Sequence, residues 1–271
     1  MKALIFDCDG VLADTERDGH RVAFNQVFAE NSVAFEWTDS AYQQALKVGG
    51  GKERLRALLS PDFTTRHDLP NDAAELEALI ASWHRRKTQL YVDLLDSGAV
   101  RPRSGVRRLS CEALEQGWRL AVASTSAHAS VRAVLNRAMG AELAEQFSVF
   151  AGDDVQRKKP APDIYLLALK QLGVRASDTV VVEDSAIGIQ AARAAGITAV
   201  IATPSTYTIH EDLSAAAIVV SELGDAGVST HCAGTNVIGN LIHDVVEQRH
   251  LQALLEIGVA PEEASNHADN K

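Results

Sequence analysis

Cysteine is scarce in this sequence, and the three that it has are widely separated. Cys8, Cys111 and Cys232 form no Cys-x-x-Cys pair and no Cys/His spacing of a zinc site. This pattern excludes a disulfide framework and a structural zinc ion as the basis of the fold. We therefore expect a reducing compartment, which is the cytoplasm, or the plastid stroma if the protein comes from a photosynthetic eukaryote.

Long apolar runs and an excess of basic residues are also missing. No window approaches the roughly 18 apolar residues that cross a bilayer, and the first apolar run meets Asp7 after four residues. We expect no membrane span, no signal peptide and no membrane partner. Acidic residues outnumber Lys and Arg by 36 to 26, for a net charge of −10, which disfavours a protein that covers nucleic-acid phosphates.

Short apolar runs, by contrast, alternate regularly with helical patterns. Runs without polar interruption are typical of strands that are buried on both faces of a parallel sheet. They predict a doubly wound, Rossmann-like α/β fold. The predicted strands are residues 2–6, 119–123, 179–183 and 198–202, and helices are predicted from Val131, Asp163 and Ile187.

Residues 17–98 break this rhythm, because they contain amphipathic helical stretches and no convincing strand. We interpret them as an inserted helical cap, with hinges near Thr15 and residues 98–105. The catalytic core is then residues 1–16 and 99–224. Residues 225–271 form a C-terminal extension of unknown role, with a helix expected between Val237 and Ile257 and a solvated tail at 261–271.

Two polar clusters follow the first two predicted strands of the core. Asp7 and Asp9 come directly after the first, where one carboxylate could attack phosphorus and the other could transfer a proton. Ser124, Thr125 and Ser126 follow residues 119–123, where hydroxyls and backbone N–H groups can bind an anion. The alternatives are a pair of surface acids and an ordinary helix N-cap.

Two further clusters lie later in the chain. Lys158 or Lys159, before two prolines, could neutralise a phosphate, although a solvated lysine is the commoner reading. Glu183 and Asp184 end a strongly apolar strand, where carboxylates need a cation or hydrogen-bond donors. Magnesium suits them, because it is held by one or two carboxylates, waters and a substrate phosphate. Asp184 could also cap the next helix.

Together, and in this order, the four clusters resemble the haloacid dehalogenase-like superfamily. The resemblance implies that Asp7 is the nucleophile and Asp9 the general acid and base, while Ser124 holds the phosphoryl group and Lys159 balances its charge. It implies that Mg²⁺ is bound by Asp7, the Asp9 carbonyl, Glu183 and Asp184. An acid at position 9 separates the sequence from the dehalogenase branch, so we expect a phosphatase that forms an aspartyl-phosphate.

The predicted cap carries basic residues around a run of three glycines. Glycine lets the backbone approach a ligand closely, and Lys47, Lys52 and Arg54 could surround an anion that the core does not hold. The alternative for Gly-Gly-Gly-Lys-Glu-Arg is a flexible loop followed by a helix start. A second phosphate on the substrate would explain the basic loop, and Lys87 adds a further cation on a later helix.

Within the superfamily the sequence is similar to the CbbY type, whose members dephosphorylate xylulose-1,5-bisphosphate, an inhibitor of the Calvin cycle enzyme Rubisco. The motifs are Phe-Asp-Cys-Asp-Gly-Val-Leu-Ala-Asp-Thr-Glu, Gly-Gly-Gly-Lys-Glu-Arg and Glu-Asp-Ser-Ala-Ile-Gly. Glu16 and Tyr42 would then contact sugar hydroxyls, and Lys52 and Arg54 the distal phosphate. The substrate-binding set that we predict is Glu16, Tyr42, Lys47, Gly50, Gly51, Lys52, Arg54, Lys87, Thr125 and Ser126.

Two other functions remain open on the sequence. A β-phosphoglucomutase or a general sugar-phosphate phosphatase would share the four core clusters. A non-catalytic protein that binds a phosphorylated metabolite could keep the fold without turnover. We expect a monomer in each case.

Overall fold

The computed structural model describes residues 1–258, and its centre is a seven-stranded sheet of order β3-β2-β1-β4-β5-β6-β7. The first six strands are parallel, and β7 runs antiparallel to β6. The Rossmann-like α/β fold is therefore confirmed. The strands are β1 (Ala3–Phe6), β2 (Arg119–Ala123), β3 (Phe147–Phe150), β4 (Thr179–Glu183), β5 (Val200–Ala202), β6 (Ile218–Val220) and β7 (Cys232–Asn236).

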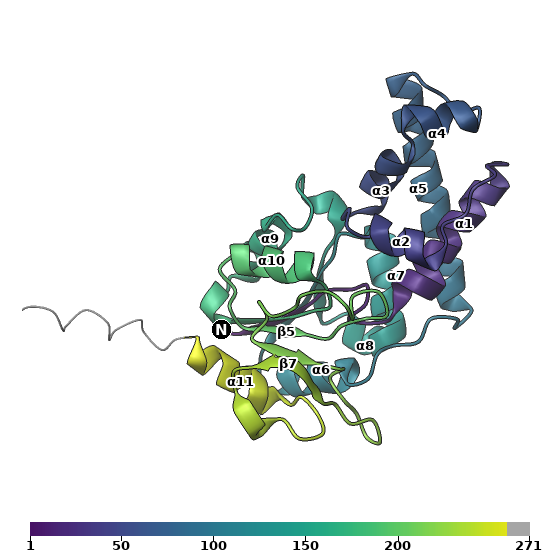
Figure 1. Ribbon diagram of the computed structural model, residues 1–271. Helices are drawn as coiled ribbons and strands as arrows, with labels where there is room; N and C mark the ends of the chain where they lie inside the picture. Colours follow the sequence, from purple (N-terminus) through teal and green to yellow (C-terminus); the bar gives the residue numbers. More distant parts are fainter. Residues whose placement is uncertain (259–271) are drawn as a thin grey trace, which may run out of the picture.

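Helices cover both faces of this sheet, as the unbroken apolar strands require (Figure 1). Alternate residues of β1 point to opposite faces, so Leu4 and Phe6 belong to one apolar cluster and Ala3 and Ile5 to the other. Helices α6, α7 and α11 contribute to the first cluster, and α9 and α10 to the second. The core helices are α6 (Val106–Glu115), α7 (His128–Met139), α8 (Ala141–Ala144), α9 (Asp163–Leu172), α10 (Ala186–Ala194) and α11 (Gln248–Ile257).

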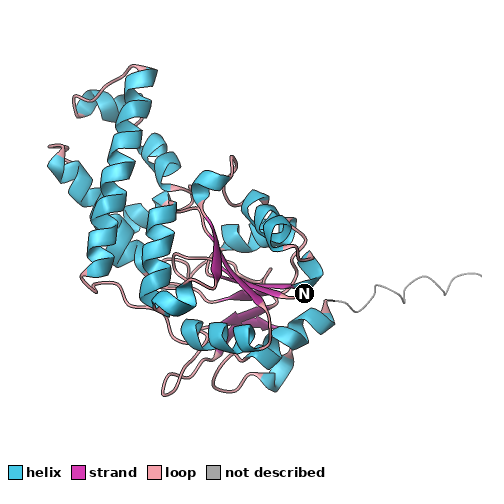
Figure 2. Cartoon of the chain, turned by 180° about the vertical axis from the view of Figure 1, so that it is seen from behind, coloured by secondary structure: helices cyan, strands magenta, loops and turns pink. Residues whose placement is uncertain are grey.

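Residues 16–98 form a helical lobe that stands clear of the sheet (Figure 2). Its longest helix coincides with the longest amphipathic stretch of the sequence, residues 73–96. Asp72 caps that helix by accepting hydrogen bonds from the amides of Ala74 and Glu75. The lobe contains a π-helical turn (Glu16–His20) and helices α1 (Arg21–Glu30), α2 (Asp39–Ala45), α3 (Gly51–Leu58), α4 (Pro61–Arg66) and α5 (Ala73–Asp96).

Two parts of the C-terminal region differ in how well the sequence predicts them. Helix α11 lies within the predicted range, but β7 was not expected, because Cys-Ala-Gly-Thr-Asn has no apolar alternation. The predicted tail at 261–271 lies outside the described residues. Within residues 1–258, no helix combines the length and apolarity that a membrane crossing requires.

Candidate active site

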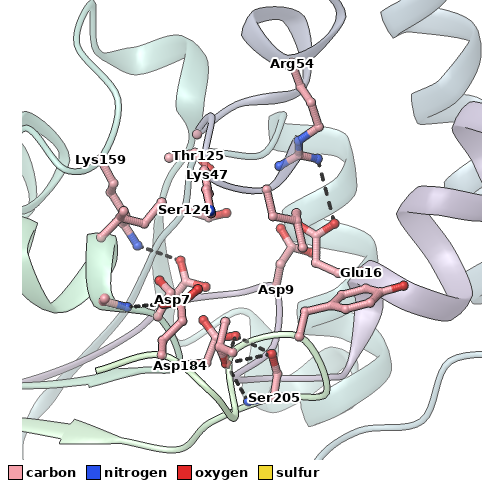
Figure 3. Close-up of a pocket in the computed structure, with 18 residues that line it drawn as sticks. Asp7, Asp9, Glu16, Lys47, Arg54, Ser124, Thr125, Lys159, Asp184 and Ser205 are labelled. Carbon is pink, nitrogen blue, oxygen red and sulfur yellow. Dashed lines mark hydrogen bonds and ion pairs between the residues drawn. The ribbon is translucent and has the colours of Figure 1, made fainter. Parts of the chain in front are cut away.

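The first, second and fourth polar clusters meet because β1 lies between β2 and β4. Asp7 follows β1, Ser124 follows β2 and Glu183 ends β4, and parallel strands bring their carboxyl ends to one edge. Figure 3 shows Asp7, Ser124 and Asp184 around a common space, with Lys159 to their left and directed at Asp7. The edge of the sheet therefore assembles groups that lie far apart in the chain.

Lys159, and not Lys158, is the cation of this site. Its Nζ donates hydrogen bonds to Asp7 Oδ1 and Glu183 Oε1, each at 2.6 Å, and to the carbonyl of Ala123 at 2.9 Å. Lys158 instead donates to the backbone carbonyls of Gly152 and Val155. The lysine that is buried among carboxylates is the one placed to balance negative charge.

Asp7, Glu183 and Asp184 offer three carboxylate oxygens that lie within 4.8 Å of one another. Burial raises the pKa of Asp7 to about 8, despite the opposing charge of Lys159, and it raises the pKa of Asp184. One lysine therefore leaves buried negative charge uncompensated. Three hard oxygen donors with this charge fit Mg²⁺, which would bind at Asp7, Asp184 and Glu183.

Glycine permits this close packing of carboxylates at two positions. A Cβ at Gly10, where φ is +86°, would lie 2.0 Å from Asp184 Oδ2. A Cβ at Gly188 would lie 2.1 Å from the Glu183 carboxylate. The glycines of both acidic motifs are therefore required by the acids beside them.

The loop after β5 supports Asp184 and was missed by sequence reasoning. Ser205 donates a hydrogen bond from its hydroxyl to Asp184 Oδ2 at 2.6 Å, and Thr208 donates to the same oxygen at 3.3 Å. The available signal was the Ser/Thr-rich segment at residues 203–208, which follows a predicted strand as residues 124–126 do. Its contact with Asp184 depends on the strand order, which the sequence did not specify.

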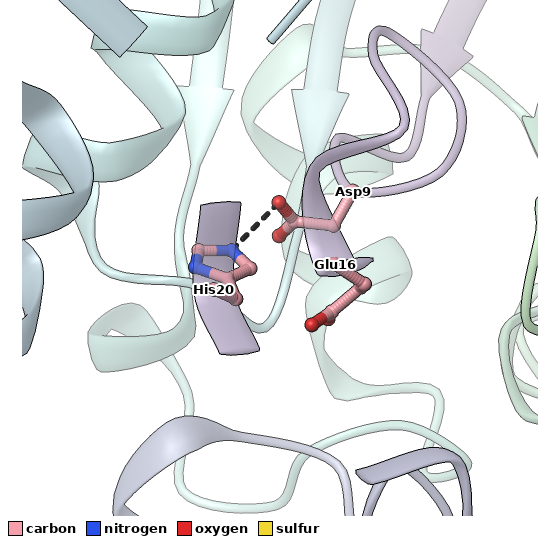
Figure 4. A group of neighbouring side chains, drawn as sticks. All are labelled: Asp9, Glu16 and His20. Carbon is pink, nitrogen blue, oxygen red and sulfur yellow. Dashed lines mark hydrogen bonds and ion pairs between the residues drawn. The ribbon is translucent and has the colours of Figure 1, made fainter. Parts of the chain in front are cut away.

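Asp9 is held as a hydrogen-bond acceptor on both of its oxygens. Oδ1 accepts from the Thr15 hydroxyl at 2.5 Å and contacts His20 Nε2 at 2.8 Å, and Oδ2 accepts from the Ser126 hydroxyl at 2.5 Å. Figure 4 shows His20 facing Asp9, with Glu16 beside them. Although burial opposes ionisation, these partners hold the pKa of Asp9 below its usual range.

Two alternative readings of the motifs are wrong. Helix α10 is capped by Ser185, which accepts from the Gly188 amide, and not by Asp184. Helix α7 has Ala127 at its N-cap and no side-chain cap, so Ser124 to Ser126 do not serve that purpose. Ser126 bonds Asp9, while Ser124 and Thr125 line the cavity.

These groups border a cavity of about 300 Å³, which residues of the helical lobe also line. Lys47, Gly49 and Arg54 come from the lobe, and Glu16 lies on its first turn. Arg54 Nη1 lies 3.8 Å from Glu16 Oε2, so the cavity has a cationic group opposite the acidic cluster (Figure 3). The core residues on its wall are Asp7, Asp9, Ser124, Thr125, Lys159, Asp184, Ser185, Ala186, Ile187, Ser205, Tyr207, Thr208 and Glu211.

Tyr42 lies behind this wall, where it connects Arg54 to Glu16. Tyr42 is fully buried. Its hydroxyl accepts a hydrogen bond from Arg54 Nη1 at 2.8 Å and donates one to Glu16 Oε2 at 2.7 Å. The expected contact of Tyr42 with sugar hydroxyls is replaced in this structure by contacts with the two residues that reach the cavity. Its phenol orients both of them.

Two predicted substrate ligands have other partners. Lys52, on α3, does not line the cavity, and its Nζ lies 3.0 Å from the carboxylate of Asp153 in the core. Lys87 is buried with its Nζ 2.5 Å from His20 Nδ1. Gly50 is the N-cap of α3, which agrees with the alternative of a loop and helix start, and Gly49 is the glycine that lines the cavity.

Comparison with known proteins agrees with this geometry. A family described as haloacid dehalogenase-like hydrolase matches residues 1–196. The chain belongs to the haloacid dehalogenase-like hydrolases. Asp7, Ser124, Lys159 and the Glu183–Asp184 pair all lie within the matched region of this hydrolase.

Relatives of this hydrolase carry the CbbY name. This hydrolase is 46% identical to a CBBY-like protein of Arabidopsis thaliana, over 82% of this chain and 69% of that protein. It is 40% identical to Protein CbbY of Rhodobacter capsulatus, over 83% and 95% of the two chains. CbbY of Rhodobacter sphaeroides, solved with phosphate, superposes with a TM-score of 0.73 at 39% identity, over 82% of this chain and 94% of that one. The chain is therefore a phosphatase of the CbbY type.

Proposed function

We propose that this phosphatase hydrolyses a sugar bisphosphate, xylulose-1,5-bisphosphate, through an aspartyl-phosphate on Asp7 and with Mg²⁺ bound. The observation that carries the proposal is a cavity with charged groups at two ends, which we call its poles. Asp7, Lys159 and Asp184 form one pole, and Arg54 and Lys47 come from the helical lobe at the other. A mutant of the Rhodobacter sphaeroides CbbY, 38% identical over 82% of this chain, has been solved with xylulose-1,5-bisphosphate at a TM-score of 0.73, which supports the substrate class.

In the first step, a carboxylate oxygen of Asp7 attacks phosphorus and the bond from phosphorus to the sugar oxygen breaks. For this step Asp9 first takes up a proton, against the hydrogen bonds from Thr15, His20 and Ser126 that favour its carboxylate form, and it then gives that proton to the leaving alkoxide. Lys159 and the hydroxyl of Ser124 balance the charge on the transferred oxygens. When bound, Mg²⁺ supplies further charge neutralisation for the phosphoryl group and orients it in line.

In the second step, water attacks phosphorus and the bond to Asp7 breaks. Asp9, now a carboxylate, takes the proton from water, which restores both residues and releases inorganic phosphate. The hydrogen bonds from Thr15, His20 and Ser126 favour the carboxylate form that this step needs. Both steps therefore use the same pair of acids.

At the other pole, we propose that Arg54 and Lys47 bind the phosphate that is not transferred. Arg54 is the better placed, because Tyr42 and Glu16 fix its guanidinium and its Nε lacks a hydrogen-bond partner in the described structure. Glu16 also reaches the cavity, where its carboxylate can accept from a sugar hydroxyl. Lys52 and Lys87 do not belong to this proposed set.

The test is phosphate release from xylulose-1,5-bisphosphate, ribulose-1,5-bisphosphate and β-glucose-1-phosphate, each with and without Mg²⁺. Rapid Mg²⁺-dependent release from the first compound alone supports the proposal. Conversion of glucose-1-phosphate to the 6-phosphate would instead identify a mutase, a reading encouraged by 29% identity to β-phosphoglucomutase of Bacillus subtilis over 74% of this chain. Binding without any turnover would identify a non-catalytic protein.

The compartment and the assembly state are proposals of the same kind. We propose the cytoplasm or the plastid stroma, with the Arabidopsis relative supporting a plant setting as one possibility to test by localisation. We also propose that the protein acts as a monomer.

A further inference from the structure

Arg103 lies on the segment that returns from the helical lobe to the core. Its backbone amide donates to the carbonyl of Leu12 at 2.9 Å, and the preceding Pro102 forms an isolated bridge with Ala13. The side chain of Arg103 therefore starts beside the loop that follows Asp7 and Asp9.

The guanidinium of Arg103 binds four backbone carbonyls from three separate segments. Nη1 donates to the carbonyls of Gly10 and, at 2.7 Å, Thr203. Nη2 donates to Pro204 at 3.1 Å and to Ser221 at 2.9 Å. One side chain thus joins the loop after β1, the loop after β5 and the end of β6.

The first two of these loops are the ones that contact Asp184. Gly10 packs directly against the Asp184 carboxylate, and Ser205, next to Pro204, donates a hydrogen bond to it. Arg103 itself is outside the cavity wall. Its contacts set how the two loops stand relative to each other around that carboxylate.

Arginine is suited to this task because its planar fork presents five donors in fixed directions. A lysine has three donors at a single point and cannot span two pairs of carbonyls. Removing the guanidinium leaves carbonyls without their donor in a mostly buried region, and such groups are costly unless the backbone moves. We therefore expect the loops after β1 and β5 to shift when the guanidinium is removed.

We propose that Arg103 is a positioning residue, which fixes the loop after Asp9 and the loop that holds Asp184 in their working arrangement. For its effect on turnover this inference rests on the proposed function. Its effect on the loops does not, because the hydrogen bonds of Arg103 join backbone groups of this chain alone.

A matched control is available in Arg108, which also bonds backbone carbonyls. Its guanidinium donates to Leu223 at 3.1 Å, Gly224 at 2.9 Å and Val246 at 2.8 Å, away from the cavity. Loss of either arginine removes comparable hydrogen bonds, but only Arg103 contacts the active-site loops. Arg108→Ala therefore measures the purely structural cost.

The experiment compares Arg103→Ala, Arg103→Lys and Arg108→Ala by thermal unfolding, amide hydrogen exchange and steady-state kinetics. Useful exchange probes are the amides of Gly10 and Thr208, which are hydrogen-bonded within the two loops, and the amide of Thr203, which donates to the carbonyl of Glu183 at the end of β4. In both Arg103 variants we expect faster exchange at these amides than in Arg108→Ala. We expect kcat to fall about tenfold or more, with KM changed less than about threefold, and millimolar guanidinium to restore part of the kcat of Arg103→Ala.

The inference is overturned if Arg103→Lys, the milder variant, matches Arg108→Ala in exchange and kcat, or if exchange rises evenly over the core. A wild-type protein that releases no phosphate, combined with exchange that rises only in the two loops of the Arg103 variants, has a different meaning. It removes the proposed function and supports the positioning role.

Discussion

At the scale of single residues, the two poles of the cavity differ in the groups that hold their cation in place. Lys159 is held by three acceptors among buried groups, so its position follows from the strand ends. Arg54 is held by Tyr42 and Glu16, and it lies on a regular helix, α3. Both cations are thus oriented by groups of the chain itself, which lowers the entropy cost of binding.

Asp7→Asn tests the nucleophile directly. The amide keeps the shape of the carboxylate but cannot attack phosphorus, so we expect phosphate release to fall by about a thousandfold or more. The unfolding temperature should change little, and Mg²⁺-dependent binding of the bisphosphate should persist in calorimetry. Retention of a tenth of the wild-type rate, roughly, would contradict a covalent step on Asp7.

Arg54→Ala tests the proposed distal phosphate site. We expect KM to rise about tenfold or more for a bisphosphate, since a charge-assisted hydrogen bond contributes about 1.5–3 kcal/mol, and to change far less for a monophosphate. Arg56→Ala is the control, because Arg56 lies on the same helix and pairs with Glu77 at the surface. Equal effects of Arg54→Ala on both substrates would mean that Arg54 only supports the lobe.

At the scale of elements, the sequence predicted those whose patterns are local. The 73–96 helix has an N-cap and a continuous amphipathic pattern, and four strands are unbroken apolar runs. Strands β3, β6 and β7 were not identified; an exposed serine interrupts the apolar residues of β3, and β7 is polar. Likewise, the sequence indicated that Asp7 and Asp184 follow strands, whereas the contacts of Lys159, Ser205 and Arg103 are revealed only by the tertiary structure.

His84, on α5 of the lobe, makes a pH-dependent contribution to the free energy of unfolding. Burial, with the nearby charges of Lys87 and Lys52, lowers the pKa of His84 to about 3, and Asp153 only partly opposes this. In the unfolded chain the imidazole of His84 takes up a proton near pH 6.5, whereas in the folded protein it stays neutral at that pH. The contribution of His84 is therefore present above pH 6.5 and is lost as the pH falls towards 3.

His84→Gln tests this linkage by urea unfolding between pH 7 and pH 5. Wild type should lose stability on acidification more steeply than the variant, by at most about 1.4 kcal/mol per pH unit. His210→Gln, at an exposed position, is the control that also removes one histidine. Parallel curves for wild type and His84→Gln would show that His84 does not contribute in this pH range.

At the scale of the whole molecule, the region after Gly224 completes the core. Strand β7 covers the edge of β6, and α11 packs its buried leucines on the sheet face that also receives α6. Arg108 ties this region to the core through the carbonyl of Val246. The family match covers residues 1–196, and this region lies beyond it.

A chain that ends at Gly224 should therefore be less stable and prone to association. It loses the apolar burial of Val246, Leu251, Leu254 and Leu255, each of which contributes about 1.5–3 kcal/mol, and it exposes the edge of β6. Thermal unfolding and light scattering measure the two effects. A truncated chain with the wild-type unfolding temperature would show that the extension is not part of the folding unit.

The helical lobe leaves the core and returns to it at nearly the same place. Ala13 and Pro102 form a bridge there, and Arg103 bonds Leu12 one step further on. An insertion whose ends are neighbours imposes no strain on the sheet that carries it. The lobe is therefore interchangeable in principle: the lobe of a relative could be grafted between the same two points, which lets substrate preference diverge while the chemistry at the strand ends is inherited unchanged.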